Sequence, residues 1–170
     1  MVSERGVRIT HSVLFTLTTL AAIVVLAISA SLVAHYNSEG YPPVHTNAYR
    51  DRIRILLAAG IWTTFMGLLL TVGFHVAGQT VVFGILTHLI PVVIAFILFI
   101  IGASSLTALT DKIDCSKAAD AFDRCNIVKG LVIISWIDTI FVFLTLIFIV
   151  VLCFIARSGF GVRRSTLYVD

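Results

Sequence analysis

Four long apolar runs fill most of this chain of 170 residues, and the charged residues collect in the short segments between them. A helix needs about 20 residues, rising about 1.5 Å each, to cross a hydrocarbon core about 30 Å thick. Every run reaches that length. We therefore predict an all-α fold, a bundle of four transmembrane helices at about 12–34, 53–76, 81–106 and 128–156.

Composition excludes the other fold classes. Hydrophobic residues make up 59% of the chain and charged residues 12%, and the mean hydropathy is +1.05, so a water-soluble domain could not bury this much apolar surface. The runs are continuously apolar, whereas a strand of a membrane β-barrel alternates over about 10 residues. The first run also exceeds the 7 to 15 residues or so of a secretory signal core, and we expect it to be retained as the first helix.

An even number of spans places both termini on one side of the membrane. The chain then divides into an N-terminal tail (1–11), a transmembrane domain (12–156) and a C-terminal tail (157–170). Basic residues occur on both faces, so the positive-inside rule leaves the orientation open.

Two cysteines in the third connection bear on that orientation. Nine residues separate Cys115 from Cys125, which gives a flexible loop enough freedom to close a disulfide. A disulfide persists on an oxidising face, outside the cell or in a lumen. We predict the disulfide, and with it cytoplasmic termini; two unpaired thiols remain the alternative. The spacing does not suit the familiar zinc patterns, so no metal site is predicted.

The third cysteine, Cys153, lies near the end of the fourth run, just before Arg157. A juxtamembrane cysteine in this position is a candidate for palmitoylation. The alternative is a small buried hydrophobic residue, which is the commoner role of a free cysteine.

A stripe of small residues runs along the second helix. Ala59, Thr63, Gly67 and Thr71 recur every four residues. Small side chains let another helix backbone approach closely, which is a main source of helix association in lipid. We expect the stripe to serve the four-helix bundle first, and contact with another copy of the chain remains the alternative.

An ionisable residue, Asp138, lies well inside the fourth run. A carboxylate in this position costs about 2.5 to 3.5 kcal/mol on insertion scales, so it should face the bundle interior or a wet cavity. Thr63 and Thr64 lie at a similar depth in the second helix, so a hydroxyl could satisfy the carboxyl group. The structural interpretation is a polar clasp between two helices; the functional one is a proton or cation site.

Signatures of enzymes and cofactors are otherwise missing. His88 in the third helix and His75 across the short second connection could suggest axial haem ligands. No second histidine pair marks another haem, and hydrogen-bonded or interfacial histidines are the commoner case. Neither a CxxC, an HExxH nor a glycine-rich phosphate loop is present. We expect no catalytic residues, no cofactor and no nucleic-acid partner.

The chain resembles the fungal MARVEL-domain proteins, small four-helix membrane proteins. The resemblance covers roughly residues 13–154 and rests on soft motifs: the four-span layout, the short second connection, the two cysteines of the third connection, and the segments YRDRIRILL, IWTT and SWIDTIFVF. It implies cytoplasmic termini and a role in organising membrane domains or in vesicle trafficking, at the plasma membrane or in the secretory pathway.

The partners expected from this resemblance are membrane lipids, further copies of the chain and other membrane proteins. Arg157, Arg163 and Arg164 could attract anionic lipids of the inner leaflet, each contributing about 1 kcal/mol near the surface. Two alternatives from other classes remain open. The chain could be a proton-linked transporter or channel subunit that uses Asp138, or an accessory subunit of a larger membrane complex.

Overall fold

The computed structural model describes residues 4–41, 46–77, 85–111, 113–115 and 124–157. Its secondary structure consists of four α-helices: α1 (Glu4–Glu39), α2 (Thr46–Ala77), α3 (Ile85–Thr110) and α4 (Cys125–Arg157). The all-α prediction is therefore confirmed. Each helix contains a stretch that is long and apolar enough to cross a membrane, and we treat the chain as a multi-pass membrane protein.

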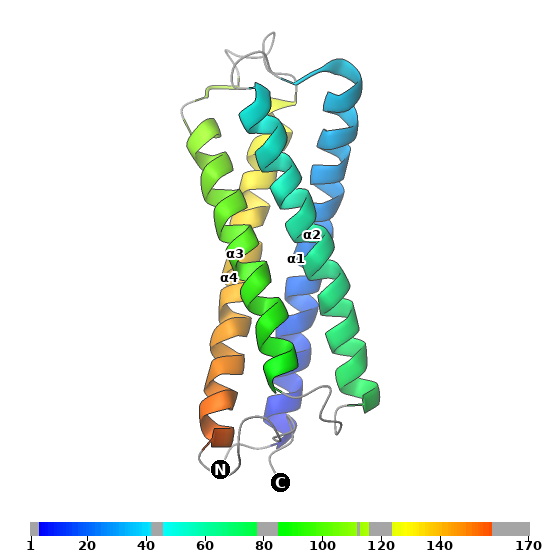
Figure 1. Ribbon diagram of the computed structural model, residues 1–170, viewed down its shortest axis with the longest axis vertical. Coiled ribbons are helices and arrows are strands. Elements are labelled where there is room, and N and C mark those ends of the chain that lie inside the picture. The colour runs from blue at the N-terminus through cyan, green and yellow to red at the C-terminus, as the bar shows by residue number, and fades with distance from the viewer. Residues whose placement is uncertain (1–3, 42–45, 78–84, 112, 116–123, 158–170) are drawn as a thin grey trace.

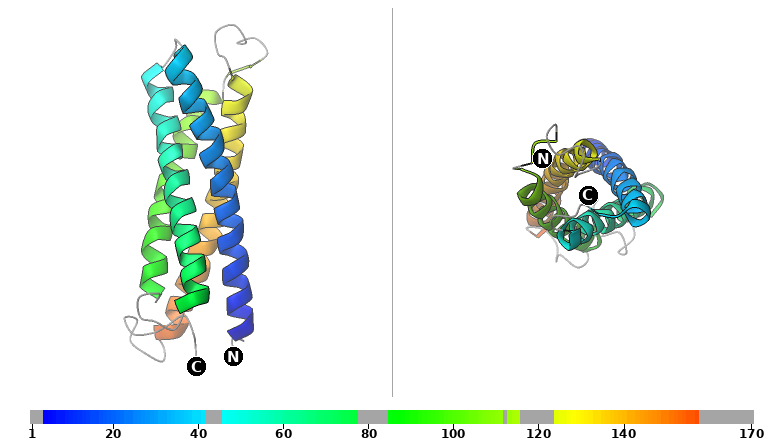
Figure 2. Two further views of the ribbon diagram at one scale, coloured as in Figure 1. Left: turned by 90° about the vertical axis from the view of Figure 1, so that its right-hand side faces the viewer. Right: turned by 90° about the horizontal axis from the view of Figure 1, so that it is seen from above.

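The helices form one elongated antiparallel bundle (Figure 1). α1 packs against α2 and α4, and α3 packs against the same two helices. Viewed along its axis, the bundle is a ring in which α2 and α4 occupy opposite corners (Figure 2). α1 begins and α4 ends at the same end of the bundle, which we call the terminal end. The opposite end, where α4 begins at Cys125, is called the disulfide end.

Three of the helices, α1, α2 and α4, are longer than the predicted spans, and α3 ends at Thr110, four residues beyond its predicted end. α1 begins at Glu4 and ends at Glu39, where the apolar run predicted 12–34, and α2 begins at Thr46 instead of residue 53. Residues 4–11, which we assigned to a tail, are therefore helical. An apolar run marks only the part of a helix that lies in hydrocarbon, whereas the backbone hydrogen bonds continue into the headgroup region.

The outward faces of all four helices are apolar. Large hydrophobic side chains with more than half of their surface exposed occur along the full length of the bundle: Ile9, Leu20, Ile61, Phe65, Leu68, Val72, Ile90, Ile133, Ile140 and Phe154. In water this surface would drive aggregation, but in a bilayer it meets lipid tails of the same polarity.

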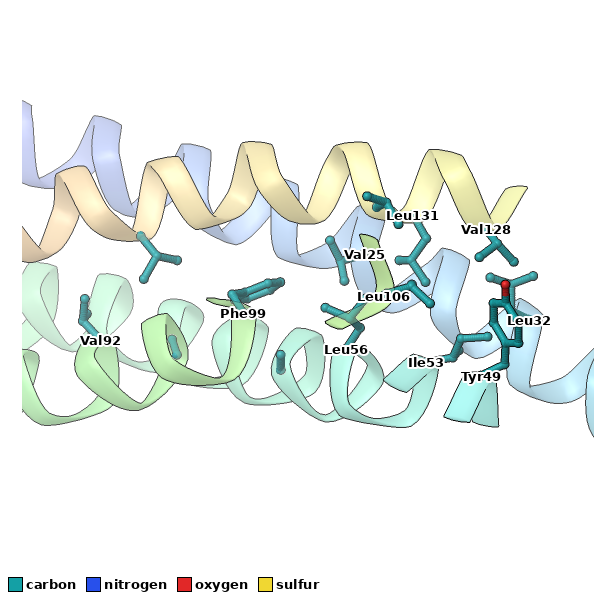
Figure 3. Packing of buried hydrophobic residues seen from close by; sticks show 14 of the residues in the cluster. Val25, Leu32, Tyr49, Ile53, Leu56, Val92, Phe99, Leu106, Val128 and Leu131 are labelled. Carbon is teal, nitrogen blue, oxygen red and sulfur yellow. The ribbon is translucent and has the colours of Figure 1, made fainter. Parts of the chain in front are cut away.

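The interior of the half nearest the disulfide end is also apolar. Ile53 and Leu56 of α2 meet Leu106 of α3, Leu131 of α4 and Leu32 of α1, and each of these side chains is fully buried (Figure 3). Among the few polar contacts, the Tyr49 hydroxyl donates a hydrogen bond of 3.2 Å to the Leu109 carbonyl, and Trp136 Nε1 donates one of 3.0 Å to Thr107.

Glycines allow α1 and α2 to approach closely. A Cβ added at Gly60 would come within 3.0 Å of the backbone nitrogen of Leu26, and one added at Gly67 would clash with the Thr19 hydroxyl. Ala59, Thr63 and Gly67 of the predicted stripe are buried, and Thr71 is half-buried. At Gly67 the stripe therefore packs inside the bundle, against α1.

Candidate functional site

The interior changes character toward the terminal end, where polar side chains lie among the buried Leu70, Ile149 and Leu152. Every helix contributes to this polar interior, and each of the side chains is at least nine-tenths buried: His11, Thr18 and Thr19 of α1, Thr63 of α2, His88 of α3, and Thr145 of α4. Thr18 and Thr145 join α1 to α4 through a hydroxyl–hydroxyl hydrogen bond of 3.3 Å. The candidate site lies beside these residues, toward the middle of the bundle.

Asp138 is the central residue of the site and is completely buried, with 0% of its surface exposed. Neither of its carboxyl oxygens receives a hydrogen bond from any residue that the structure describes. Ser135 lies one turn earlier on the same face of α4, is equally buried, and its hydroxyl also lacks a described partner. Polar groups without partners are rare in a folded interior and point to an unseen ligand or a bound water.

The register of the helices places the site near mid-height. α1 and α4 are antiparallel, and Thr18 contacts Thr145. Moving seven residues toward the disulfide end on both helices brings Asp138 level with Val25 of α1. Ser29 lies one turn beyond Val25, is fully buried, and donates a hydrogen bond of 2.7 Å to the Val25 carbonyl. Three fully buried polar side chains, those of Ser29, Ser135 and Asp138, thus lie at nearly the same height.

The predicted clasp between Asp138 and the threonines of α2 is not formed. The hydroxyls of Thr63 and Thr64 are buried, but neither has a hydrogen-bond partner among the described residues. The prediction gave the correct depth of the residues along the helices but not the positions of the two helices around the ring. α2 and α4 lie at opposite corners of the ring and are not packed directly against each other as neighbouring helices are.

A small cavity lies on the terminal side of Asp138. Its volume is about 20 Å³, which is enough for about one water molecule. All four helices line it, and its wall is almost wholly apolar, although four threonines belong to it: Thr18, Thr19, Thr63 and Thr145. Val142, one turn from Asp138 on the same face of α4, also belongs to the wall. The Thr63 side chain therefore borders a space large enough for one water molecule.

Histidines occupy the interior between the cavity and the terminal end. The rings of His11 and His88 are in edge contact, with centroids 5.2 Å apart, and Phe15 stacks on His11 at 4.3 Å. His88 thus contacts α1. The side chain of His75, the other predicted haem ligand, lies outside the described residues. His11 was not among the predicted site residues, although it shares a helical face with Phe15, Thr18 and Val25.

The two loop cysteines lie at the disulfide end of the bundle. The sulfur atoms of Cys115 and Cys125 are at bonding distance, 1.96 Å, and their Cα atoms are 5.6 Å apart, which is typical of a disulfide. Cys153 is a free, half-buried thiol near the end of α4. The side chain of Arg157, and the whole of Arg163 and Arg164, lie outside the described residues.

Within the described part of the chain, no three histidine, cysteine or acidic side chains lie close enough together to hold a metal ion. The chain matches no protein-family model, no curated protein and no solved structure.

Proposed function

We propose that this protein is a non-enzymatic membrane organiser of the kind that the MARVEL resemblance implies. It acts at the plasma membrane or in the secretory pathway, with both termini in the cytoplasm, by contacting lipids and further copies of itself. One observation carries the proposal: nearly all of the described chain belongs to four spanning helices with apolar outward faces. Most of the surface of such a molecule can contact only lipids and other membrane helices.

The outward faces support this role because they are continuous. Ile61, Phe65, Leu68 and Val72 follow one another along α2, and Ile133, Ile140, Leu144 and Ile147 do so along α4. The small-residue stripe of α2 packs within the bundle at Gly67. Self-association would therefore use these bulky outward faces, in which van der Waals contacts between helices compete with contacts to lipid.

Native mass spectrometry of the protein extracted with its own lipids tests the proposal. We expect a homo-oligomer that retains lipids, together with a mass shift on reduction. Outward-facing substitutions locate the contact: Val72→Trp on α2 and Ile133→Trp on α4 leave the interior intact, and at least one should lower the number of copies. A monomer without bound lipid, or a complex in which another protein takes the place of further copies, would contradict the proposal.

Proton-linked transport is a second candidate function, and one observation favours it: Asp138 is buried without a hydrogen-bond donor among the described residues. If the chain moves protons, vesicles containing it should acidify under a pH gradient, and Asp138→Asn should abolish this flux while the bundle still assembles. If the chain is only an organiser, vesicles that contain the wild type or the variant should both be impermeable to protons.

A further inference from the structure

None of the described residues that surround Asp138 carries a positive charge. Lys129 is the nearest basic residue on α4, nine positions or about 13 Å along the helix, and it donates a hydrogen bond to the Ile113 carbonyl. At the height of Asp138, the facing segments of α1 (21–29), α2 (56–64) and α3 (95–106) contain no titratable residue. The nearest titratable groups toward the terminal end are His11 and His88, and toward the disulfide end Lys129 and Arg124.

An ionised carboxylate in such a place would be a buried charge with no compensation. Buried charges in proteins are paired, neutralised or bound to a cation, because their desolvation is otherwise prohibitive. A metal cation would need several oxygen ligands, commonly six or so for a hard ion. The described site offers Asp138 with the hydroxyls of Ser135 and Ser29, and the Ser29 hydroxyl already donates to the Val25 carbonyl. This ligand set is too small for a metal ion but sufficient for a proton.

We propose that Asp138 is a proton-binding site in the middle of the bundle, and that its proton exchanges with the terminal end along the buried threonines and histidines of that half. As the neutral acid, Asp138 gains a hydroxyl that can donate to Ser135 one turn away. The inference concerns the same residue as the transport candidate, but it requires only binding and exchange and not net movement across the membrane.

The interior differs on the two sides of Asp138. This difference indicates that the proton reaches Asp138 from one end of the bundle only. Toward the terminal end, the next layer is the cavity with Thr18, Thr63 and Thr145, followed by His11 and His88. Hydroxyls and imidazoles can hydrogen-bond to water and relay a proton. Toward the disulfide end, fully buried side chains close the interior, namely those of Leu32, Ile53, Leu56, Leu106 and Leu131 (Figure 3). Water entering that layer would find no hydrogen-bond partner among them.

Infrared spectroscopy of the full chain in a detergent without ester groups tests the binding site, because the ester carbonyls of lipids absorb in the same region as a protonated carboxyl group. A protonated carboxyl group has a C=O stretching band above the amide bands, and exposed carboxyl groups, with ordinary pKa values near 4, do not contribute to it at pH 7. We expect this band at pH 7 in wild type, its loss in Asp138→Asn, and its retention in Asp111→Asn, where the residue is exposed. A wild-type spectrum without the band would overturn the proposal even if the variants fail to fold. Loss of the band in excess sodium ions would do the same, because a metal ion would then occupy the site.

The rate of deuterium exchange tests the access route. On transfer to D₂O the band shifts as the carboxyl proton is replaced. Thr63→Val removes a hydroxyl at the cavity and should slow this shift several-fold. Thr110→Val, a buried threonine of α3 toward the disulfide end, should leave the rate unchanged. The reverse order of the two variants would place access at the disulfide end and overturn the assigned route. If the carboxyl band is present but vesicles show no proton flux, proton-linked transport is excluded while the proton-binding site at Asp138 stands.

Discussion

The two halves of the bundle have the same helices but differ in what fills the interior. The disulfide half is packed with fully buried leucine and isoleucine side chains and is joined to the third connection by the Cys115–Cys125 disulfide. The terminal half contains threonines, histidines and a cavity. Asp138 lies between the two. The difference shows that one apolar sequence pattern can contain a region suited to rigidity and a region suited to hydration.

The physical basis of this difference is the solvent. In lipid, burying a leucine between helices gains no hydrophobic energy, because lipid tails are as apolar as the core. Stability then comes from close packing, from covalent links and from hydrogen bonds between helices. The disulfide half uses the first two, and the terminal half depends more on the third. Substitutions in the two halves should therefore differ in how much they lower the stability, and in how far along the bundle they destabilise the structure.

Removing the disulfide should have the largest effect on stability. In the chain-entropy model, closing a loop between residues 10 positions apart contributes about 3 kcal/mol. We expect Cys115→Ser combined with Cys125→Ser to lower the unfolding temperature in detergent and to speed amide exchange at 128–132. Exchange at 15–19, in the terminal half, should change little. Equal acceleration at both ends would mean that the halves unfold as one unit, and the comparison would fail.

Two leucines of α2 provide the next test. Leu56 belongs to the disulfide half and is 0% exposed, whereas Leu70 lines the cavity and is 1% exposed. Leu56→Ala should create a dry void and cost about 2 kcal/mol, at the low end of the range for such truncations because the transfer term is absent in lipid. Leu70→Ala should cost less, because it enlarges an existing cavity, beside which the hydroxyls of Thr18 and Thr63 can hydrogen-bond to water that enters. The measurement is the unfolding free energy of both variants in the same detergent. A larger cost for Leu70→Ala would show that the cavity is dry.

The sequence predicts well which residues form the helices, but it does not predict which face of each helix is buried. Length and hydropathy identify four spans, and an even number of spans brings Glu4 and Arg157 to the same end, as the structure has it. Apolar residues surround each helix, however, because both lipid and core accept them. Without a polar face, periodicity does not indicate which side is buried. The inward direction of Ser29 and Ser135 was therefore not predictable from their positions alone.

The error in the predicted clasp has the same origin. Depth along a helix follows directly from the residue number, so Asp138 and Thr63 were correctly placed near the same height. The order of helices around the ring does not follow from hydropathy; α2 and α4 lie at opposite corners, and Asp138 and Thr63 do not hydrogen-bond to each other. His11 was missed for a related reason: it was assigned to a tail, because the apolar run begins after it.

The smallest expected effect tests the hydrogen bond that joins α1 to α4 in the terminal half. The hydroxyls of Thr145 and Thr139 each donate to the carbonyl four residues earlier on α4, at 2.8 and 2.7 Å, and both side chains are buried. Only Thr145 also meets a hydroxyl of another helix, that of Thr18 at 3.3 Å. Thr139→Val is therefore a matched control for Thr145→Val.

We expect Thr145→Val to lower the unfolding free energy by about 0.6 kcal/mol more than Thr139→Val does, which is the average for hydrogen bonds between membrane helices. The effect is small because Thr18 can turn its hydroxyl toward the cavity and bind water there. Unfolding of the two variants in one detergent, followed by circular dichroism, measures the difference. A cost of several kcal/mol would mean that water does not reach Thr18, and the terminal half would then be as dry as the disulfide half.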